Sequence, residues 1–427
     1  MQEAKTAEII MFKSKFKKLV PEFLISFYHW LWALVGALVY GFPSSYIKII
    51  GVTGTNGKST VVTFTRKILE EAGFKVASVS SISFQLGDEK KQNDLKMTMP
   101  GRGQLHAFLK KAIKKDCDYA IIEVTSEGIK QHRHRFINFD AAVFTNLKPE
   151  HIEAHGSFEN YKHAKGKLWK QLKEDGISII NLDDKHSDYF WNFPAGVKYG
   201  YTTRKLSKDN IIKAENIELE NKFPQFTVDE VNFELPVSGK FNIYNALAAI
   251  SIGKTQEVDL KTCSEALKKV QKISGRMEVV IEDPFKVVVD YAHTPDALQN
   301  VYKSLGGNLI CVLGSCGGGR DRWKRSVLGE IADKNCEDII LTNEDPYDED
   351  PRRIVEDIKE GIKNKEKVKV ILDREQAIEE ALKRADNSNT VVITGKGSEP
   401  WMCVSNGEKI PWDDREIVKE KVNNKDS

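Results

Sequence analysis

A glycine-rich stretch between a predicted strand and a predicted helix constrains this chain most. The apolar residues Tyr46–Val52 read as a strand, and Lys58–Ala72 has the pattern of a helix that ends at Gly73. Between them the sequence reads Gly51-Val-Thr-Gly-Thr-Asn-Gly-Lys-Ser-Thr60. Glycines in such a turn let backbone N–H groups face a phosphate, and the helix dipole adds to the attraction. The stretch therefore predicts a phosphate-binding loop.

Two side chains of this loop suit nucleotide chemistry. Lys58 is placed to reach the β- and γ-phosphates, and the Ser59 hydroxyl to ligate Mg²⁺. The strict phosphate-loop pattern requires glycine where this chain has Val52, so one position departs from it. The alternative is a glycine-rich turn with a surface lysine, but strand, loop and helix occur in the required order. We expect ATP to be bound by Gly54, Thr55, Asn56, Gly57, Lys58, Ser59 and Thr60.

Alternation of short apolar runs with amphipathic stretches predicts an α/β fold with a mostly parallel sheet. Further strands are expected at Phe74–Ser80, Asp118–Val124, Ala141–Asn146 and Ile177–Asn181. A helix is expected from an N-cap at Ser157 through Trp169 towards Glu174. Residues 200–237 lose the helical period and predict a small β-rich insertion, after which Asn242–Ile252 returns to helix.

A second alternation begins near Arg276 and predicts a separate Rossmann-like unit. Its strands are expected at Met277–Ile281, Lys286–Asp290, Leu309–Leu313, Asp338–Leu341, Lys367–Ile371 and Thr390–Thr394. The chain of 427 residues is thus expected to have three parts. They are an apolar helical segment (residues 1–45), a central ATP-binding domain (46–274) and a C-terminal domain (275–427).

Charge and cysteine content exclude some classes of protein. Lys plus Arg (64) nearly balances Asp plus Glu (62), which argues against a nucleic-acid partner because phosphate neutralisation needs a basic excess. The six cysteines form no Cys-x-x-Cys pair, so a disulfide scaffold or zinc ribbon is not expected. A reducing cytoplasm is the simplest setting.

An apolar run, Phe23–Phe42, breaks the soluble pattern. It has about the 20 residues that span a bilayer. It follows Lys13, Lys15, Lys17 and Lys18. Lysines before a single span favour a cytoplasmic N-terminus, which would put the ATP-binding domain outside the cell. We therefore expect a membrane-surface or re-entrant helix at the inner face of the membrane. The alternative is a helix docked on the body of the protein.

Further motifs follow the loop in a fixed order. They are Glu123-Val-Thr-Ser-Glu-Gly128, Gln131-His-Arg133, Phe144-Thr-Asn-Leu147, His151-Ile-Glu-Ala-His-Gly156, Ala164-Lys165, Gly275-Arg-Met-Glu278, Asp290-Tyr-Ala-His-Thr-Pro-Asp296, Gly317–Arg325 and Gly395-Lys-Gly397. With the loop, they make residues 47–412 resemble the Mur ligases, ATP-dependent amino-acid-adding enzymes of peptidoglycan synthesis. The resemblance is strongest to the tripeptide synthetase branch.

The resemblance implies a set of metal and nucleotide residues. Ser59 and Glu123 would hold the Mg²⁺ of ATP, and His151 would help hold a second Mg²⁺. Lys165 would be carbamoylated by CO₂ and so become an anion able to ligate or orient that second metal, whereas by itself it reads as part of a solvated lysine face. We expect catalysis to depend on Lys58, Lys165, Glu123 and His151. Further ATP contacts would come from Asn245, Arg276, Asp290 and His293.

The resemblance also implies the reaction. The γ-phosphoryl group of ATP would pass to the carboxylate of a muramoyl-peptide, giving an acyl phosphate that an amino acid attacks to form the amide. Folylpolyglutamate-synthetase-like activity, and a membrane-associated nucleotide-binding scaffold, are the alternatives. The residues expected at the two organic substrates are Thr125, Ser126, Arg133, Asp345, Tyr347, Lys396 and Glu399.

Two departures from the family bear on substrate choice. Only about 46 residues precede the phosphate loop, too few for the family's UDP-binding domain, so the acceptor is either lipid-linked or held as a UDP-linked molecule by the central domain. Family members that select diaminopimelate have Asp-Asn-Pro-Arg, whose arginine clamps the distal carboxylate. This chain has Glu344-Asp-Pro-Tyr347. Diaminopimelate is therefore disfavoured and lysine or ornithine expected, unless the acids there are only a solvated loop.

Overall fold

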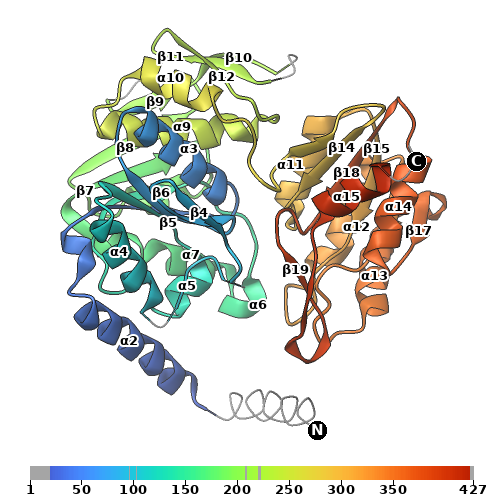
Figure 1. Ribbon diagram of the computed structural model, residues 1–427, viewed down its shortest axis with the longest axis horizontal. Coiled ribbons are helices and arrows are strands. Elements are labelled where there is room, and N and C mark those ends of the chain that lie inside the picture. The colour runs from blue at the N-terminus through green and yellow to red at the C-terminus, as the bar shows by residue number, and fades with distance from the viewer. Residues whose placement is uncertain (1–19, 96, 102, 207–208, 220–222, 424–427) are drawn as a thin grey trace. The chain divides into compact units, whose positions relative to one another are not determined.

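The computed structural model describes residues 20–95, 97–101, 103–206, 209–219 and 223–423 (Figure 1). They form two compact units. We call Pro21–Pro149 with Ser157–Gln271 the middle unit, and Glu150–Gly156 with the chain from Lys272 onward the C-terminal unit. The lysines before the apolar run, Lys13, Lys15, Lys17 and Lys18, lie outside the described residues.

The middle unit is built on a nine-stranded sheet. Its strands are β1 (Lys48–Thr53), β2 (Val76–Val79), β3 (Ser83–Leu86), β4 (Glu89–Gln92), β5 (Tyr119–Glu123), β6 (Phe139–Phe144), β7 (Leu172–Asn181), β8 (Val197–Thr202) and β9 (Ile211–Lys213). Their order is β4-β3-β2-β5-β1-β6-β7-β8-β9. The β4-β3 and β3-β2 pairs are antiparallel and the other pairs are parallel. The carboxyl ends of β1, β5 and β6 therefore meet at one edge of the sheet.

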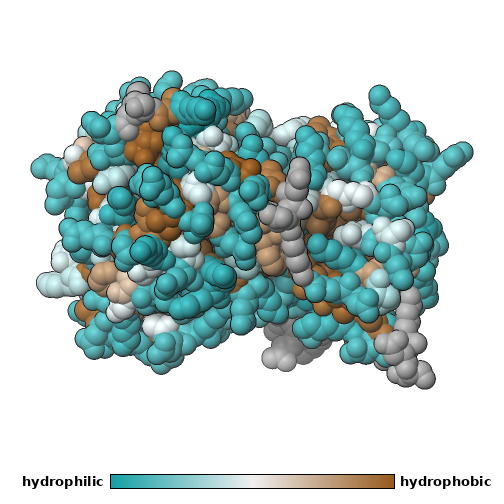
Figure 2. Space-filling model, turned by 90° about the horizontal axis from the view of Figure 1, so that it is seen from above, coloured by the Kyte–Doolittle hydropathy of each residue, from teal (hydrophilic) through white to brown (hydrophobic). Residues whose placement is uncertain are grey.

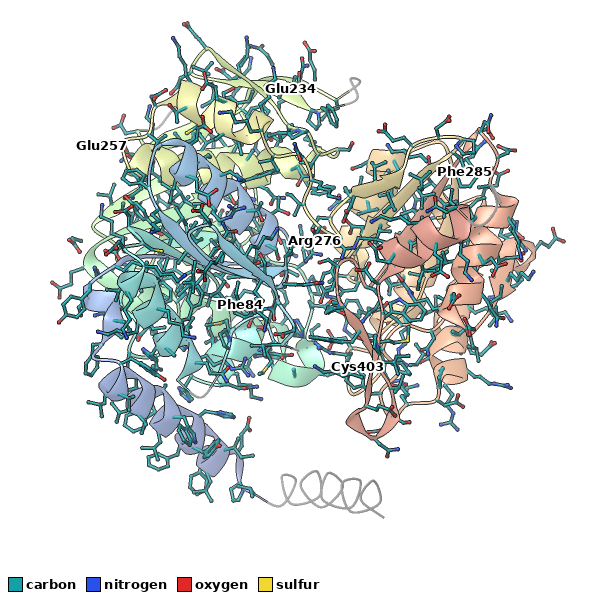
Figure 3. All side chains as sticks on the ribbon, in the orientation of Figure 1. Phe84, Glu234, Glu257, Arg276, Phe285 and Cys403 are labelled. Atoms are coloured by element: carbon teal, nitrogen blue, oxygen red, sulfur yellow. The ribbon has the colours of Figure 1, made fainter. Side chains whose placement is uncertain are left out.

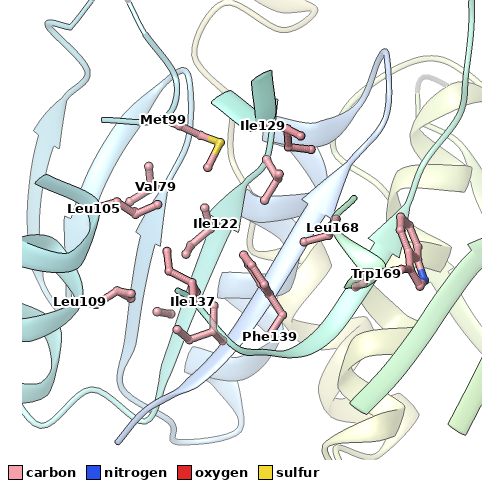
Figure 4. Close-up of a cluster of buried hydrophobic side chains, with 14 of the residues drawn as sticks. Val79, Met99, Leu105, Leu109, Ile122, Ile129, Ile137, Phe139, Leu168 and Trp169 are labelled. Atoms are coloured by element: carbon pink, nitrogen blue, oxygen red, sulfur yellow. The ribbon is translucent and has the colours of Figure 1, made fainter. Parts of the chain in front are cut away.

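Helices pack against this sheet because its central strands are apolar on both faces. The helices are α2 (Glu22–Val39), α3 (Lys58–Glu71), α4 (Gln104–Lys114), α5 (Ser126–Lys130), α7 (Phe158–Gly166), α8 (Ser187–Trp191), α9 (Phe241–Thr255) and α10 (Leu260–Lys268), with short 3₁₀ turns at Pro43–Ser45 and Trp169–Gln171. Side chains of α4, α5, α7 and α8 share one buried cluster with the strands (Figure 4). Helix α3 packs against α9 and α10.

The predicted β-rich insertion is present. Strands β10 (Glu215–Glu218), β11 (Gln225–Val228) and β12 (Val231–Glu234) form a small antiparallel sheet. Helix α10 packs against β12.

One predicted helix is shorter than expected. Ser157 is its N-cap, accepting a hydrogen bond from Asn160 N at 3.1 Å, but α7 ends at Gly166 instead of running towards Glu174. Leu172 begins β7 and pairs with Phe139 of β6. Sheet pairing therefore takes the residues that the helical pattern had assigned to α7.

The C-terminal unit has a six-stranded sheet. Its strands are β13 (Glu278–Ile281), β14 (Lys286–Asp290), β15 (Asn308–Leu313), β16 (Asp338–Leu341), β17 (Val368–Val370) and β18 (Asn389–Thr394). The order is β13-β14-β18-β15-β16-β17, parallel except for the β13-β14 pair. A hairpin of β19 (Trp401–Cys403) and β20 (Lys409–Pro411) follows.

Helices also surround this second sheet. They are α11 (Pro295–Leu305), α12 (Lys324–Asn335), α13 (Pro351–Glu360), α14 (Arg374–Arg384) and α15 (Asp414–Asn423), with 3₁₀ turns at Lys365–Lys367 and Ser405–Gly407. Helices α14 and α15 share a buried core with the strands, and α12 packs between α11 and α13. The short helix α6 (Ile152–His155) also belongs to this unit. The predicted α/β class with two sheets is confirmed, and the predicted strands agree with the observed ones apart from their ends.

The apolar run forms helix α2, which begins after Pro21 and contains Gly36, as expected. Within the described part of the chain, it is the one helix whose length and composition would suffice to cross a membrane. Only Ala33, Gly36 and Ala37 of its residues are buried.

Candidate functional site: a phosphate loop and an acidic pocket

The predicted phosphate loop joins the carboxyl end of β1 to α3. Gly54 has φ +150°, and a Cβ built there would lie 1.9 Å from Thr145 Oγ1, so only glycine fits this close approach. Asn146 holds the loop from the end of β6, since its backbone O accepts from Thr55 N at 2.8 Å and its Oδ1 from Asn56 N at 2.9 Å. The loop is therefore held in place by hydrogen bonds from its own backbone to Asn146.

Lys58 and Ser59, the first residues of α3, face the carboxylate of Glu123 at the end of β5. Ser59 Oγ donates to Glu123 Oε2 at 2.8 Å, and Lys58 Nζ lies 4.0 Å from Glu123 Oε1. Lys58 Nζ also donates to Thr55 O at 2.7 Å. Ser81, which follows β2, donates its backbone N–H to Glu123 Oε2 at 2.9 Å. Glu123 is only 3% exposed, so it is a buried acid of this edge and not a surface residue.

This arrangement fits Mg²⁺. The hydroxyl of Ser59 and the carboxylate of Glu123 are hard oxygen ligands that already touch each other. Among the described residues, no group of three or more His, Cys, Asp or Glu side chains could hold a metal by itself. Two protein ligands completed by phosphate oxygens and water are the usual pattern for nucleotide-bound Mg²⁺.

Lys165 is buried beside the same loop, although the sequence around it reads as a solvated face. It is 2% exposed and lies on α7 one turn after Tyr161. Its Nζ donates to Gly54 O at 2.6 Å and lies 4.6 Å from the centre of the Tyr161 ring. The Tyr161 hydroxyl is 3.0 Å from Thr55 Oγ1. The structure thus brings Lys165 into the phosphate loop with Lys58 and Ser59.

Two further predicted nucleotide residues belong to this unit. Thr60 is buried in the first turn of α3. Asn245 of α9 donates through Nδ2 to Asn242 Oδ1 at 2.9 Å. Its Oδ1 would lie 2.2 Å from a Cβ at Gly57, which places the amide against the loop.

The residues expected at the acceptor follow β5. Thr125 caps α5 by accepting from Gly128 N at 3.1 Å, and Ser126 is buried in the first turn. Arg133 donates to Met99 O and to the Sδ of Met97. Burial lowers the pKa of Arg133. Thr125 N also donates to Met99 Sδ at 3.4 Å, so Thr125 and Arg133 contact the segment 97–101, which sequence analysis had not singled out.

His151 belongs to the segment Glu150–Gly156, which is part of the C-terminal unit. It has φ +55° and immediately precedes α6. The carboxylate of Asp321 accepts from the backbone N–H groups of Ile152 and Glu153, at 3.2 and 2.9 Å. Lys324 donates to Glu150 at 2.8 Å in a buried ion pair. The glycine-rich stretch 314–325 thus binds the residues on both sides of His151, through the backbone after it and the Glu150 side chain before it.

Arg276 lies where the chain enters the C-terminal unit, and Figure 3 labels it. Its guanidinium stacks over Tyr291, 4.3 Å from the ring centre. Asp290 accepts from Met277 N and Ala292 N, at 2.6 and 2.7 Å, and burial raises its pKa. His293 Nδ1 lies 2.9 Å from Tyr291 O, and burial lowers the pKa of His293 well below its usual value. This histidine is therefore neutral at physiological pH.

A buried cluster of charged side chains joins the loop after β16 to the loop after β18, and we call this cluster the acidic pocket. Lys396, with no exposed side-chain surface, donates to Asp345 at 2.8 Å and to Glu399 at 2.7 Å. Burial disfavours its charge, but these two carboxylates raise the pKa of Lys396 above its usual value. Glu399 also accepts from the Tyr291 hydroxyl at 3.1 Å. Tyr291 is thus a link, missed in the sequence, between Arg276 and the pocket.

Glu344 adds another buried acid to this pocket. Its Oε1 accepts from Cys316 Sγ at 3.0 Å, and within the described residues its Oε2 has no hydrogen-bond partner. Burial raises the pKa of Glu344. Tyr347 follows with φ +53°, and its backbone N donates to Cys403 O at 3.2 Å. No arginine stands at this position to bind a distal carboxylate.

The remaining acids of the same loop have structural partners. Asp348 accepts from Asn406 N, Glu349 pairs with Arg325 at 2.6 Å, and Asp350 caps α13. The alternative of a merely solvated acidic loop is therefore wrong for Glu344 and Asp345, which are 2% and 5% exposed.

Comparison with known proteins identifies the chain. Residues 52–253 match the Mur ligase middle domain, and residues 275–397 match the Mur ligase glutamate ligase domain. The UDP-N-acetylmuramoyl-L-alanyl-D-glutamate–2,6-diaminopimelate ligase of Clostridium botulinum is 34% identical over 91% of this chain and 81% of its own length. The enzyme with this name from Syntrophomonas wolfei is 36% identical over 92% and 82%. This chain belongs to the Mur ligase family.

Solved structures agree with that assignment. A diaminopimelate ligase of the same name has a TM-score of 0.60 at 30% identity, covering 89% of this chain and 79% of its own. Folylpolyglutamate synthase of Mycobacterium tuberculosis has a TM-score of 0.69 at 15% identity, covering 86% and 92%, which shows a shared fold alone.

Family membership establishes the chemistry at its coarse level. The chain is an ATP-dependent, carbon–nitrogen bond-forming Mur ligase of the amino-acid-adding type, acting in peptidoglycan precursor synthesis. Mur ligases are cytoplasmic enzymes that use ATP and Mg²⁺. The loop that holds Lys58, Ser59 and Lys165 falls in the matched middle domain, and the acidic pocket falls in or next to the matched C-terminal domain.

Proposed function

We propose that this Mur ligase adds an amino acid with a distal ammonium and no distal carboxylate, such as lysine or ornithine, to a muramoyl-dipeptide. The observation that supports this choice is the pocket of Glu344, Asp345 and Glu399, in which Lys396 is the paired cation and Tyr347 replaces the family arginine. Two carboxylates share the one ammonium of Lys396, and a second ammonium would neutralise the excess negative charge.

The relatives are named for diaminopimelate, which carries both an ammonium and a carboxylate at its far end. Tyr347 offers a phenol in place of a guanidinium, and burial raises its pKa, so it stays neutral. A neutral phenol cannot supply the bidentate, charge-assisted hydrogen bonds that an arginine gives a carboxylate. We therefore expect diaminopimelate to be the poorer substrate.

The proposed reaction has two steps. An oxygen of the acceptor carboxylate attacks the γ-phosphorus of ATP, forming a carbon–oxygen–phosphorus link and releasing ADP. The neutral amine of the amino acid then attacks the carbonyl carbon, a proton leaves the nitrogen, and inorganic phosphate departs as the amide forms. Lys58 would offset the charge of the transferring phosphoryl group, and Mg²⁺ held by Ser59 and Glu123 would neutralise phosphate oxygens.

We also propose that Lys165 is carbamoylated. Its burial against Gly54 O and the Tyr161 ring supports this, because an ammonium is costly to bury whereas a carbamate can face a cation. The Nζ would add to the carbon of CO₂ and lose one proton, leaving a carboxylate in the phosphate loop. This group would serve a second Mg²⁺.

The acceptor is proposed to be UDP-linked, as the relatives' names state of those enzymes. A lipid-linked muramoyl-peptide is the second candidate, and the exposed apolar side of α2 is the observation that favours it. We propose Thr125, Ser126 and Arg133 as the residues that hold the peptide part.

Phosphate release from ATP tests the proposal. The enzyme is given UDP-N-acetylmuramoyl-L-alanyl-D-glutamate with each of a panel of amino acids, and products are identified by mass. Release that requires both the acceptor and lysine or ornithine, with the corresponding tripeptide product, is the expected result. Release with a folate acceptor only would favour the folylpolyglutamate alternative, and no acceptor-dependent release would favour the scaffold.

A further inference from the structure

Helix α2 has two different halves. One half faces the body of the middle unit and includes Ser26, Trp30, Ala33, Gly36 and Ala37. The last three are small and buried. A Cβ built on Gly36 would lie 2.5 Å from Gly103 Cα, so the helix backbone touches the start of α4. Small residues at such a crossing allow this approach. This half of α2 therefore packs closely against the middle unit; we call it the docked half.

Polar and aromatic contacts fix the same half. Ser26 Oγ lies 2.7 Å from His132 Nε2, and the Trp30 ring meets Phe136 edge-on with 5.7 Å between centres. At its N-terminal end, Glu22 pairs with Lys130 of α5 at 2.9 Å. These contacts hold α2 flat along the unit over most of its length.

The other half of α2 is apolar and exposed. At 100° per residue, its members fall within one half of the helix circumference. They are Phe23, Leu24, Phe27, Tyr28, Leu31, Trp32, Val35, Leu38 and Val39, each at least 36% exposed. Figure 3 shows side chains of α2 projecting outward from the unit. Phe42 and Tyr46, just beyond the helix, are also exposed.

This concentration differs from the one face of the molecule that Figure 2 shows. The face shown in Figure 2 is mostly hydrophilic with scattered apolar residues. A contiguous exposed apolar stripe of this kind marks a binding surface. The docked half excludes a simple span, because a helix in the bilayer core would have to leave Ser26, Trp30 and Gly36 without their protein contacts.

Charge indicates what covers the stripe. In the sequence, Lys13, Lys15, Lys17 and Lys18 precede the helix, and Glu22 is the one acidic residue from position 9 to 69. This acid is paired with Lys130. A basic stretch next to an apolar stripe with Tyr and Trp is the pattern of a helix that lies in the interface of an anionic bilayer.

We propose that α2 binds the middle unit to the surface of anionic membranes, with its exposed half in the headgroup–acyl boundary and its docked half still on the protein. The inference concerns where the ligase works and does not depend on which amino acid or acceptor it uses. It does distinguish an interfacial helix from the helix docked wholly on the protein, which the sequence left open, and it also excludes a bilayer span.

Vesicle flotation of the full chain tests the proposal. Phosphatidylcholine vesicles are compared with vesicles that also contain phosphatidylglycerol. We expect binding about tenfold or more stronger to the anionic vesicles, and weaker at high salt. The triple variant Phe27→Ser, Leu31→Ser, Leu38→Ser should lower binding about a hundredfold. Val197→Ser with Leu219→Ser, exposed apolar residues elsewhere in the middle unit, is the matched control and should bind as the unchanged chain does.

Position in the bilayer is tested with a dye on Val35→Cys. Five of the six native cysteines are buried and Cys316 is half-buried, so the unchanged chain gives the labelling background. A blue shift on adding anionic vesicles, with release by alkaline carbonate, is the expected result. Resistance to carbonate would overturn the interfacial helix in favour of a span. A lipid-free dimer that the triple variant dissociates, or equal flotation of the triple variant, would also overturn the proposal.

Discussion

The two units hold their buried cations in different ways. In the middle unit, Lys58 and Lys165 donate to backbone carbonyls of the phosphate loop, at 2.7 and 2.6 Å. In the C-terminal unit, Lys396 and Arg374 donate to carboxylates, at 2.8 Å and less. An amine against a neutral carbonyl can turn to a phosphate or react with CO₂ at small cost. A cation in a buried ion pair cannot, so it fixes the shape and charge of a pocket.

The largest expected effect concerns a lysine of the phosphate loop in the middle unit. Lys58→Ala should reduce the rate of ATP-dependent amide formation about a thousandfold, because it removes the ammonium that offsets the negative charge of the transferring phosphoryl group. Steady-state phosphate release measures this. The melting temperature should stay near that of the unchanged chain, and Lys67→Ala, a half-exposed lysine on the same helix, should leave the rate intact.

The next effect concerns stability in the C-terminal unit. Arg374 donates through Nε and Nη2 to the two carboxylate oxygens of Asp414, and neither side chain is exposed. Arg374→Met should lower the free energy of unfolding by about 3 kcal/mol, since it leaves a buried carboxylate unpaired. Urea denaturation measures the change. Lys369→Met, which removes one partner of the more exposed pair with Glu380, should cost less than about 1 kcal/mol.

Substitution of Lys165 tests whether this lysine acts in catalysis or only in structure. Lys165→Ala should reduce the rate about a hundredfold, and short carboxylic acids or bicarbonate should restore part of it if the missing group is a carbamate. Lys167→Ala, an exposed neighbour, is the control. Full activity of Lys165→Ala would rule the carbamate out. So would a mass of the intact protein, measured after storage in bicarbonate, that does not include the mass of one CO₂.

A third kind of buried group, an uncharged histidine, predicts a pH effect in the middle unit. Burial lowers the pKa of His106 from 6.5 to about 4. Its contribution to stability is therefore present above pH 6.5 and lost as the pH falls towards 4. Between pH 7 and pH 5 this residue should cost about 2 kcal/mol of unfolding free energy. His106→Leu should flatten that pH dependence, whereas replacing the exposed His163 by Gln should not.

The smallest expected effect concerns the amino-acid preference that we assign to residue 347. Tyr347→Arg should raise the preference for diaminopimelate over lysine about tenfold, through new hydrogen bonds to the distal carboxylate. The ratio of kcat/KM for the two amino acids measures this. Tyr347→Phe should leave the ratio unchanged, and an unchanged ratio for the arginine variant would show that residue 347 does not face the amino acid.

Sequence predicted the sheet edges better than the contacts between side chains. The phosphate loop, Glu123 and Thr125 follow strands whose apolar runs are unmistakable, so their common edge could be inferred from parallel pairing. Lys165 could not be distinguished from its exposed neighbours, because burial of one lysine on a helix depends on what packs there. Tyr291, in a motif already noted, gave no signal of its link to Glu399.

Two errors have the same cause. The end of α7 was misplaced because Leu172 pairs with Phe139, which lies more than thirty residues away. The acids after Glu344 could not be sorted into pocket and structural members, since their partners Arg325 and Asn406 come from distant segments. Long-range partners are not visible in a local pattern.

Competition between two amino acids tests the central claim most directly, that the chemistry of the family is kept while its amino-acid pocket is changed. Equal concentrations of lysine and meso-diaminopimelate are given with ATP and UDP-N-acetylmuramoyl-L-alanyl-D-glutamate, and the tripeptide products are weighed by mass spectrometry. The account predicts a product that contains mostly lysine. A product that contains mostly diaminopimelate would contradict it.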